Sequence, residues 1–167
     1  KIHTQYSICE GAIKIDELKD FCKENKINSI GLSDTSNLCG SLEFAEKISK
    51  AGTQPIIGTQ INFKYEDTIG LLPLFALNQK GYKEIIELSS QSYLNNEKVS
   101  DPYLDFSRIL DLNSSGVIML SGTVFGLFGK LFDKGKFLEI SKLYEELSKN
   151  FGDRFYLEIQ RHNDHNE

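Results

Sequence analysis

Residues 28–63 decide the fold, and they read NSIGLSDTSNLCGSLEFAEKISKAGTQPIIGTQINF. The apolar run at 28–32 predicts a buried strand. Residues 41–50 repeat apolar side chains at helical spacing and are followed by Gly52, the residue type that commonly ends a helix. The β-rich residues 55–63 predict the next strand. A strand, a helix and a second strand in this order are typical of parallel strands with helices packed outside them.

The same alternation continues on both sides of this stretch. Helices are predicted at 15–24, 81–92, 124–133 and 137–150, and strands at 71–77, 117–120 and 155–160, with a strand stub at 2–4. The polar residues 93–111 contain Pro102, which predicts a loop with a short helical piece at 106–110. We therefore expect an α/β domain, either an open doubly wound sheet or a barrel. Both architectures place function at the carboxyl ends of strands.

Composition sets outer bounds on the class of protein. The 167 residues correspond to about one domain, and 40% of them are hydrophobic, which is enough for a globular core. A net charge of −5 argues against binding nucleic acid through a basic surface. The three cysteines fit no metal-binding pattern and predict reduced thiols. The uncharged stretch at 69–79 contains Pro73 and is too short to cross a bilayer, so we expect a cytoplasmic protein without membrane contact.

A glycine-bearing run, SGTVFGLFGK at 121–130, invites comparison with phosphate-binding loops. It lacks a glycine at 124 and a serine or threonine at 131, and the dinucleotide pattern of three spaced glycines is absent. The glycines predict a tight turn and close helix packing instead.

Three polar residues follow predicted strands and could meet at one edge of the sheet. These are His3, Asp34 and His162. Two imidazoles and one carboxylate can hold a divalent ion. The alternative is that the histidines are ordinary polar residues and that Asp34 caps the turn at 35–37. The spacing alone leaves both interpretations open.

Several ordered motifs resemble one family. Residues 1–11, KIHTQYSICEG, resemble the HxHSxYSxxDG signature that opens the PHP (polymerase and histidinol phosphatase) domain of the bacterial replicative DNA polymerase III alpha subunit. LSDTSNLCG at 32–40 is similar to LTDHxNxxG, and AGTQPIIGTQ at 51–60 to AGIKPIIGxE. FGDRFYLEIQRH at 151–162 resembles FGDRFYLEIQxH. The resemblance implies a distorted TIM-like (β/α)7 barrel, present here as an incomplete piece of about six strands, with residues 1–167 forming a truncated N-terminal PHP domain.

The resemblance also carries over the metal-ligand positions of the family. They fall on Lys1, His3, Asp34, Thr35, Gln60, Leu71, Thr123 and His162. Only His3, Asp34 and His162 keep the family's residue type. A cluster of divalent ions needs several anionic or imidazole ligands, and a two-metal phosphoester mechanism needs ions about 3.5–4 Å apart. We therefore expect no metal and no catalytic residues in this piece, and at most one weakly held ion on the three surviving residues.

The functional expectation that follows is a scaffold. The resemblance implies a parent DNA-directed DNA polymerase that uses Mg²⁺ at a site outside this piece. It implies the rest of the alpha chain, a separate proofreading exonuclease subunit, the replicase holoenzyme with its sliding clamp, and DNA held through the parent chain as partners. One alternative is an active PHP phosphoesterase or 3′–5′ exonuclease that uses Zn or Mn. Another is a free-standing phosphatase related to histidinol phosphatase.

Overall fold

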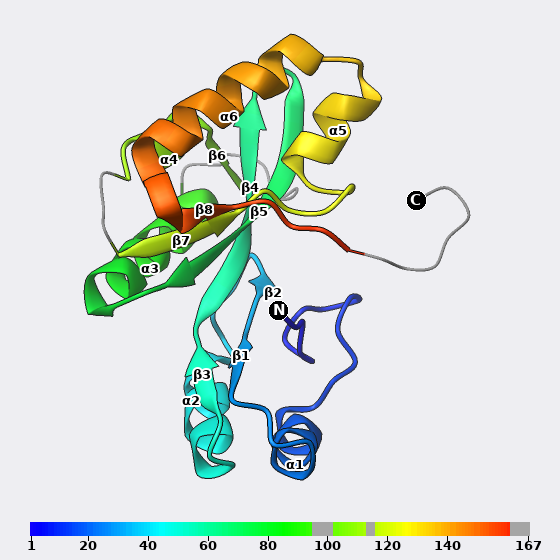
Figure 1. Ribbon diagram of the computed structural model, residues 1–167, viewed down its shortest axis with the longest axis vertical. Helices are drawn as coiled ribbons and strands as arrows, with labels where there is room; N and C mark the ends of the chain where they lie inside the picture. Colours follow the sequence, from blue (N-terminus) through cyan, green and yellow to red (C-terminus); the bar gives the residue numbers. More distant parts are fainter. Residues whose placement is uncertain (95–101, 113–115, 161–167) are drawn as a thin grey trace.

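The computed structural model describes residues 1–94, 102–112 and 116–160, arranged as an elongated α/β domain (Figure 1). Its lower part holds the first two helices and a pair of short strands, and its upper part holds the longer strands and the remaining helices. The elements in chain order are α1 (Ile15–Glu24), β1 (Ser29–Gly31), β2 (Asp34–Thr35), α2 (Ser41–Lys50), β3 (Gln54–Ile56), β4 (Gly58–Tyr65), β5 (Thr68–Ala76), α3 (Gln79–Leu94), β6 (Tyr103–Asp105), α4 (Ser107–Leu110), β7 (Val117–Leu120), α5 (Leu127–Asp133), α6 (Phe137–Phe151), a 3₁₀ turn (Gly152–Arg154) and β8 (Phe155–Tyr156).

The strands form two sheets, and residues 2–4 add isolated β-bridges near the start of the chain. β1 pairs with β3, and the larger sheet has the order β2-β4-β5-β7-β8, with β6 beside β4. Leu32 joins the two sheets, because its N–H donates to the Ile56 carbonyl at 2.9 Å while Leu32 also bridges to Ile2. Within the described residues, the larger sheet has six strands including β6, which is consistent with the expected piece of a distorted barrel.

The expectation of uniformly parallel strands is wrong at β5. β5 runs antiparallel to both β4 and β7, whereas β2 with β4 and β7 with β8 are parallel. Tyr65 pairs with Thr68, so only two residues connect β4 to β5. A loop of two residues can form a hairpin but cannot carry the chain back for a parallel pairing, which needs a crossover of a dozen residues or more.

Other predicted elements agree with the structure to different degrees. The helices at 15–24 and 41–50 and the strand at 117–120 have the predicted bounds. The segment 93–111 contains α4 as expected, but it also contains β6, which pairs parallel with β4. The predicted strand at 155–160 is paired only at 155–156. Gly122 has a φ of 78°, which fits the predicted tight turn after β7.

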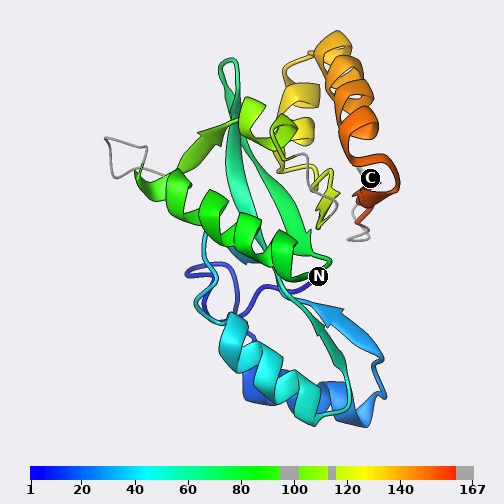
Figure 2. The ribbon, with the colours of Figure 1, turned by 90° about the vertical axis from the view of Figure 1, so that its left-hand side faces the viewer.

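Two apolar clusters hold the domain together. The smaller one joins α1, α2 and the first strands through side chains such as Ile15, Leu32 and Phe44. The larger one is built from side chains of β4, β5, β7 and the helices α3, α5 and α6. The perpendicular view shows how these helices lie beside the strands (Figure 2). None of the described helices is long and apolar enough to span a membrane.

Candidate functional site

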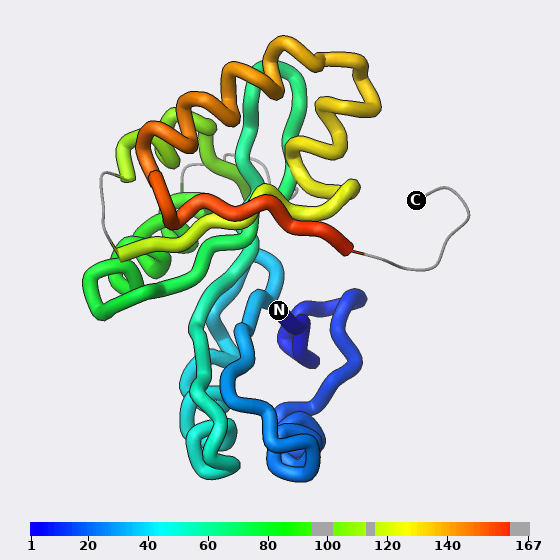
Figure 3. Tube along the Cα trace, viewed as in Figure 1, coloured from blue at the N-terminus to red at the C-terminus, as the bar shows by residue number. Residues whose placement is uncertain are grey.

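A cavity of about 380 Å³ opens where five of the predicted ligand positions meet. It is lined by the start of the chain, by β4 and β5, by the loop after β7 and by the segment after β8, whose convergence can be followed in the chain trace (Figure 3). The predicted positions in its wall are Lys1, His3, Gln60, Leu71 and Thr123. Five of the eight predicted positions, which are far apart in the sequence, therefore line one cavity.

Strand register explains why distant residues share this wall. Thr35 on β2 pairs with Gln60 on β4, and Asn62 pairs with Leu71 on β5. Because directly paired residues and alternate residues of a strand lie on the same face, Thr35, Gln60 and Leu71 belong to one face of the sheet. Gln60 Nε2 donates to Thr35 Oγ1 at 2.7 Å. The Thr35 hydroxyl in turn donates to the Glu10 carboxylate, so the three side chains are linked in a row by hydrogen bonds.

Lys1 makes the closest charge contact of the site. Its Nζ lies 3.0 Å from the Glu158 carboxylate, and the two side chains are only 8% and 9% exposed. Glu158 lies just after β8, so this ion pair links the first and last described segments of the sheet. A lysine offers three donors and no acceptor, and therefore cannot ligate a metal ion while charged.

Asp34 is buried and its carboxylate is fully engaged with the N-terminal segment. Oδ1 accepts from the Thr4 backbone N–H at 2.6 Å and from the Ser7 hydroxyl at 2.7 Å, and Oδ2 accepts from the Thr4 hydroxyl at 2.7 Å. Asp34 is not part of the cavity wall. Its observed role is to fix residues 4–7, a role that neither of the two sequence interpretations anticipated.

His3 is half-buried in the cavity wall. Burial and the neighbouring Lys1 ammonium lower the pKa of the imidazole, whereas Glu10 and Asp34 act in the opposite direction. Its Nδ1 is shielded from solvent and has no hydrogen-bond partner within the described part of the chain. His162, the third surviving ligand type, lies outside the described residues.

The donor set fits a divalent metal poorly. Among residues 1–94, 102–112 and 116–160, no three His, Cys, Asp or Glu side chains are placed to share an ion. The predicted positions supply an ammonium, an amide, an aliphatic group and two hydroxyls where the family has imidazole, carboxylate and thiolate groups. These groups do not provide the anionic or imidazole ligands that a cluster of ions requires.

The prediction missed two acidic residues and one amide at this site. Glu10 and Gln160 line the cavity, and Glu158 pairs with Lys1. Glu10 stands at the acidic position of the opening motif, so the sequence carried a signal for it. Glu158 gave no comparable signal, because its importance depends on the position of Lys1 at the opposite end of the sheet.

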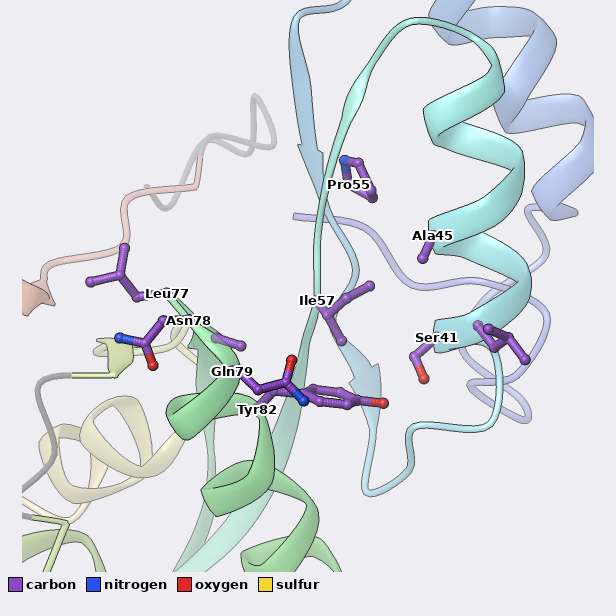
Figure 4. A pocket seen from close by; sticks show the side chains of 10 residues that line it. Ser41, Ala45, Pro55, Ile57, Leu77, Asn78, Gln79 and Tyr82 are labelled. Carbon is purple, nitrogen blue, oxygen red and sulfur yellow. The ribbon is translucent and has the colours of Figure 1, made fainter.

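A second opening, also about 380 Å³, lies between α2, the end of β3 and the start of α3 (Figure 4). Its wall is mostly apolar and includes Leu42, Ile57 and Leu77, with Tyr82 at one side. Leu42 and Leu77 are 72% and 57% exposed. None of the predicted ligand positions within the described part of the chain lines this groove, and its described lining contains no acidic or basic side chain.

Comparison with known proteins places the chain in a family. The family model described as "PHP domain" matches residues 1–162. DNA polymerase III subunit alpha of Caulobacter vibrioides is 37% identical over 97% of this chain and 15% of its own length, and that of Rickettsia felis is 34% identical over 97% and 13%. The subunit of Borreliella burgdorferi is 34% identical over 96% and 15%. The chain therefore spans about one seventh of these curated relatives.

One solved structure shows a weaker likeness. It comes from Bifidobacterium adolescentis, and its description assigns it to metal-dependent phosphoesterases. It is 18% identical and superposes with a TM-score of 0.45 over 56% of this chain and 32% of that one. The match to the family model over residues 1–162 establishes that the chain belongs to the PHP domain family.

Proposed function

We propose that this chain is the PHP domain of a replicative DNA polymerase III alpha subunit and serves there as a structural module without hydrolytic activity of its own. The similarity to three such subunits over nearly the whole chain supports the first part. Nucleotidyl transfer with Mg²⁺, contact with DNA and assembly with a replicase and its sliding clamp would belong to the rest of the parent chain.

The Lys1–Glu158 ion pair is the observation that carries the proposed loss of hydrolysis. It brings an ammonium group to the position that the resemblance assigns to a histidine ligand, and it neutralises the Glu158 carboxylate. A cation placed beside this carboxylate would be repelled by the ammonium group already there. Two-metal hydrolysis needs two ions that hold one phosphate between them. The Lys1 ammonium group opposes the binding of an ion at this position.

The remaining polar groups strengthen the same argument. The Asp34 carboxylate accepts three hydrogen bonds from residues 4–7, and the Gln60 amide donates a hydrogen bond to the Thr35 hydroxyl. Leu71 offers no electron pair to a metal ion. A bound ion would have to break existing hydrogen bonds and would gain few charged ligands in return.

The proposal includes docking of a separate proofreading exonuclease subunit. A polymerase whose own hydrolytic centre is lost needs proofreading from another protein. The net charge of −5 suits a protein-facing module better than a DNA-facing one. The apolar groove between α2 and α3, with the exposed Leu42 and Leu77 at its wall, offers anchoring space for side chains of such a partner.

A phosphoesterase assay tests the proposed inactivity. Wild type and His3→Ala are incubated with p-nitrophenyl phosphate, and separately with 3′-labelled single-stranded DNA, in Mn²⁺ or Zn²⁺. We expect equal rates at background level for both proteins. Metal-dependent hydrolysis that His3→Ala abolishes would overturn the proposal.

A variant with restored ligands provides the positive control. It combines Lys1→His, Thr35→His, Gln60→Glu, Leu71→His and Thr123→Cys. We expect it to bind Mn²⁺ or Zn²⁺ more tightly than wild type in a calorimetric titration, because it replaces the groups that oppose binding with imidazole, carboxylate and thiolate donors.

An active metal-dependent phosphoesterase or 3′–5′ exonuclease is the second candidate. The solvent-shielded Nδ1 of His3, which has no partner among the described residues, favours it. A metal ion could use that nitrogen. Stoichiometric Zn or Mn in protein purified without chelator, together with hydrolysis that depends on His3, would select this function instead.

A further inference from the structure

The Lys1–Glu158 pair is a buried contact between opposite ends of the sheet. The Nζ-to-carboxylate distance is 3.0 Å, and solvent reaches less than a tenth of either side chain. The other ion pairs among the described residues contain at least one side chain that is more than 30% exposed. This pair therefore differs from the surface pairs, whose contribution to stability is usually small.

Backbone hydrogen bonds fix both partners in place. Next to Lys1, the Ile2 N–H donates to the Gly31 carbonyl at 2.8 Å. The N–H of Glu158 donates to Ser121 Oγ at 2.9 Å, and the Ser121 N–H donates to the Tyr156 carbonyl at 2.9 Å. The backbone beside Lys1 is thus held to β1, and the backbone of Glu158 is held to Ser121, which follows β7 and is itself bonded to β8. Their contact closes the gap between the first and last described segments.

We propose that the Lys1 ammonium is the resident cation of this cavity and acts as a strap that holds the sheet ends together. The family's metal ions would supply positive charge among its acidic groups, whereas here the protein supplies that charge itself. Glu158 could not remain buried as a carboxylate without a nearby positive charge. The fold of this domain then needs no divalent ion.

The inference rests on the proposed loss of the metal centre, but it makes its own measurable claim. A buried ion pair leaves a costly unpaired charge when either partner is removed. The single substitutions Lys1→Met and Glu158→Gln should each lower the stability of the domain. The double substitution should lower it by less than the sum of the two single effects. Such coupling is specific to a direct interaction between the two side chains.

The experiment is a double-mutant cycle by thermal unfolding of the protein. We expect each single substitution to lower the unfolding midpoint by on the order of 10 °C, and the double variant to lie well above the additive expectation. Lys80→Met is the matched control, because Lys80 is 68% exposed and lies 4.0 Å from Glu84. It should leave the midpoint nearly unchanged. If the two single changes in the unfolding midpoint simply add in the double variant, the proposed interaction between Lys1 and Glu158 is wrong.

The charge-reversed variant Lys1→Glu/Glu158→Lys covers the case in which a single variant does not fold. It keeps an opposite-charge pair at the same place, so we expect it to fold with a midpoint above that of either single variant. A swap that is no better than the single variants would contradict the proposal.

Chelation separates this inference from the proposed function. We expect the wild-type midpoint to be the same in EDTA and in Mn²⁺. A wild-type midpoint that falls in EDTA would overturn the claim that Lys1 is the resident cation. Strong Lys1–Glu158 coupling in a protein that nevertheless hydrolyses phosphoesters would leave the strap intact and refute only the proposed inactivity.

Discussion

Asp34 shows what a single residue's sequence context can and cannot reveal. Its motif predicts a ligand of a metal cluster, and its position before a polar turn predicts a cap. In the structure, its carboxylate holds Thr4 and Ser7, which lie 30 and 27 positions earlier in the chain. Both partners stand in the opening motif, so the residues were visible, but only the fold shows that they meet. The sequence could not reveal that this carboxylate already accepts three hydrogen bonds.

Asp34→Asn tests this structural role. An amide replaces one acceptor oxygen with a donor, so at least one hydrogen bond from Thr4 or Ser7 is lost in a buried place. We expect a loss of about 2–3 kcal/mol in the free energy of unfolding, measured by urea denaturation. Asp133→Asn, an exposed carboxylate on α5, is the control and should change it by less than about 0.5 kcal/mol. An unchanged stability of Asp34→Asn would contradict the anchoring role.

The β4–β5 hairpin is the element at which prediction from sequence failed. Residues 55–63 and 71–77 were correctly predicted as strands, but the pattern of alternation suggested that they run parallel. The turn at Glu66 and Asp67 has no glycine, and Glu66 adopts a φ of 52°. A turn without the usual glycine or asparagine gives little local signal, so the hairpin is evident only from its register.

Ion pairs link the hairpin tip to two lysines between α5 and α6, and they predict that the stability of the domain depends on pH. Asp67 lies 2.6 Å from Lys136 Nζ and 3.2 Å from Lys134 Nζ. Hydrogen bonds from Lys136 and then Lys134 hold the pKa of the Asp67 carboxyl well below its usual range. A depressed carboxyl pKa contributes stability above the unfolded pKa of about 4, and this contribution is lost as the pH falls toward the folded value.

Asp67→Asn should therefore remove part of the acid sensitivity of the domain. We expect the urea midpoint of wild type to drop more between pH 6 and pH 3 than that of Asp67→Asn. The difference will be modest because the carboxylate is exposed. Asp153→Asn, which changes a carboxylate remote from the hairpin tip, should follow wild type. Equal pH dependence of Asp67→Asn and wild type would refute the role of these ion pairs.

Close packing of α3 on β7 is a second feature at the scale of elements. A methyl group added at Gly81 would lie 1.7 Å from the carbonyl oxygen of Gly116, so the helix can approach the strand only with glycine there. We expect Gly81→Ala to lower the free energy of unfolding by about 1–3 kcal/mol, measured by urea denaturation. Lys83→Ala, on an exposed part of the same helix, should be nearly neutral. A neutral Gly81→Ala would show that α3 is free to shift.

For the whole molecule, the ordered motifs were more informative than periodicity. The motifs identified the family, and five of the positions that they mark line one cavity, whereas the strand segments were predicted from periodicity. They could not reveal the Lys1–Glu158 ion pair, since it joins residues near the two ends of the described chain. They also gave no indication of the apolar groove, whose walls come from the four elements α2, β3, β5 and α3.

The groove leads to a prediction about assembly. Leu42→Asp places a charge at its exposed wall, and we expect it to weaken binding of the purified proofreading exonuclease subunit about tenfold or more in a calorimetric titration. Leu138→Asp, on α6, is the matched control because Leu138 is similarly exposed at 76% and lies outside the groove. Equal affinity of both variants and wild type would place docking elsewhere.

The metal content of the protein tests the central claim most directly. The protein is purified without chelator, equilibrated with Mn²⁺ and Zn²⁺, passed through a desalting column and analysed by inductively coupled plasma mass spectrometry. We expect far less than one metal ion per chain, and the same trace value in His3→Ala. One or more ions per chain in wild type, lost in His3→Ala, would contradict it.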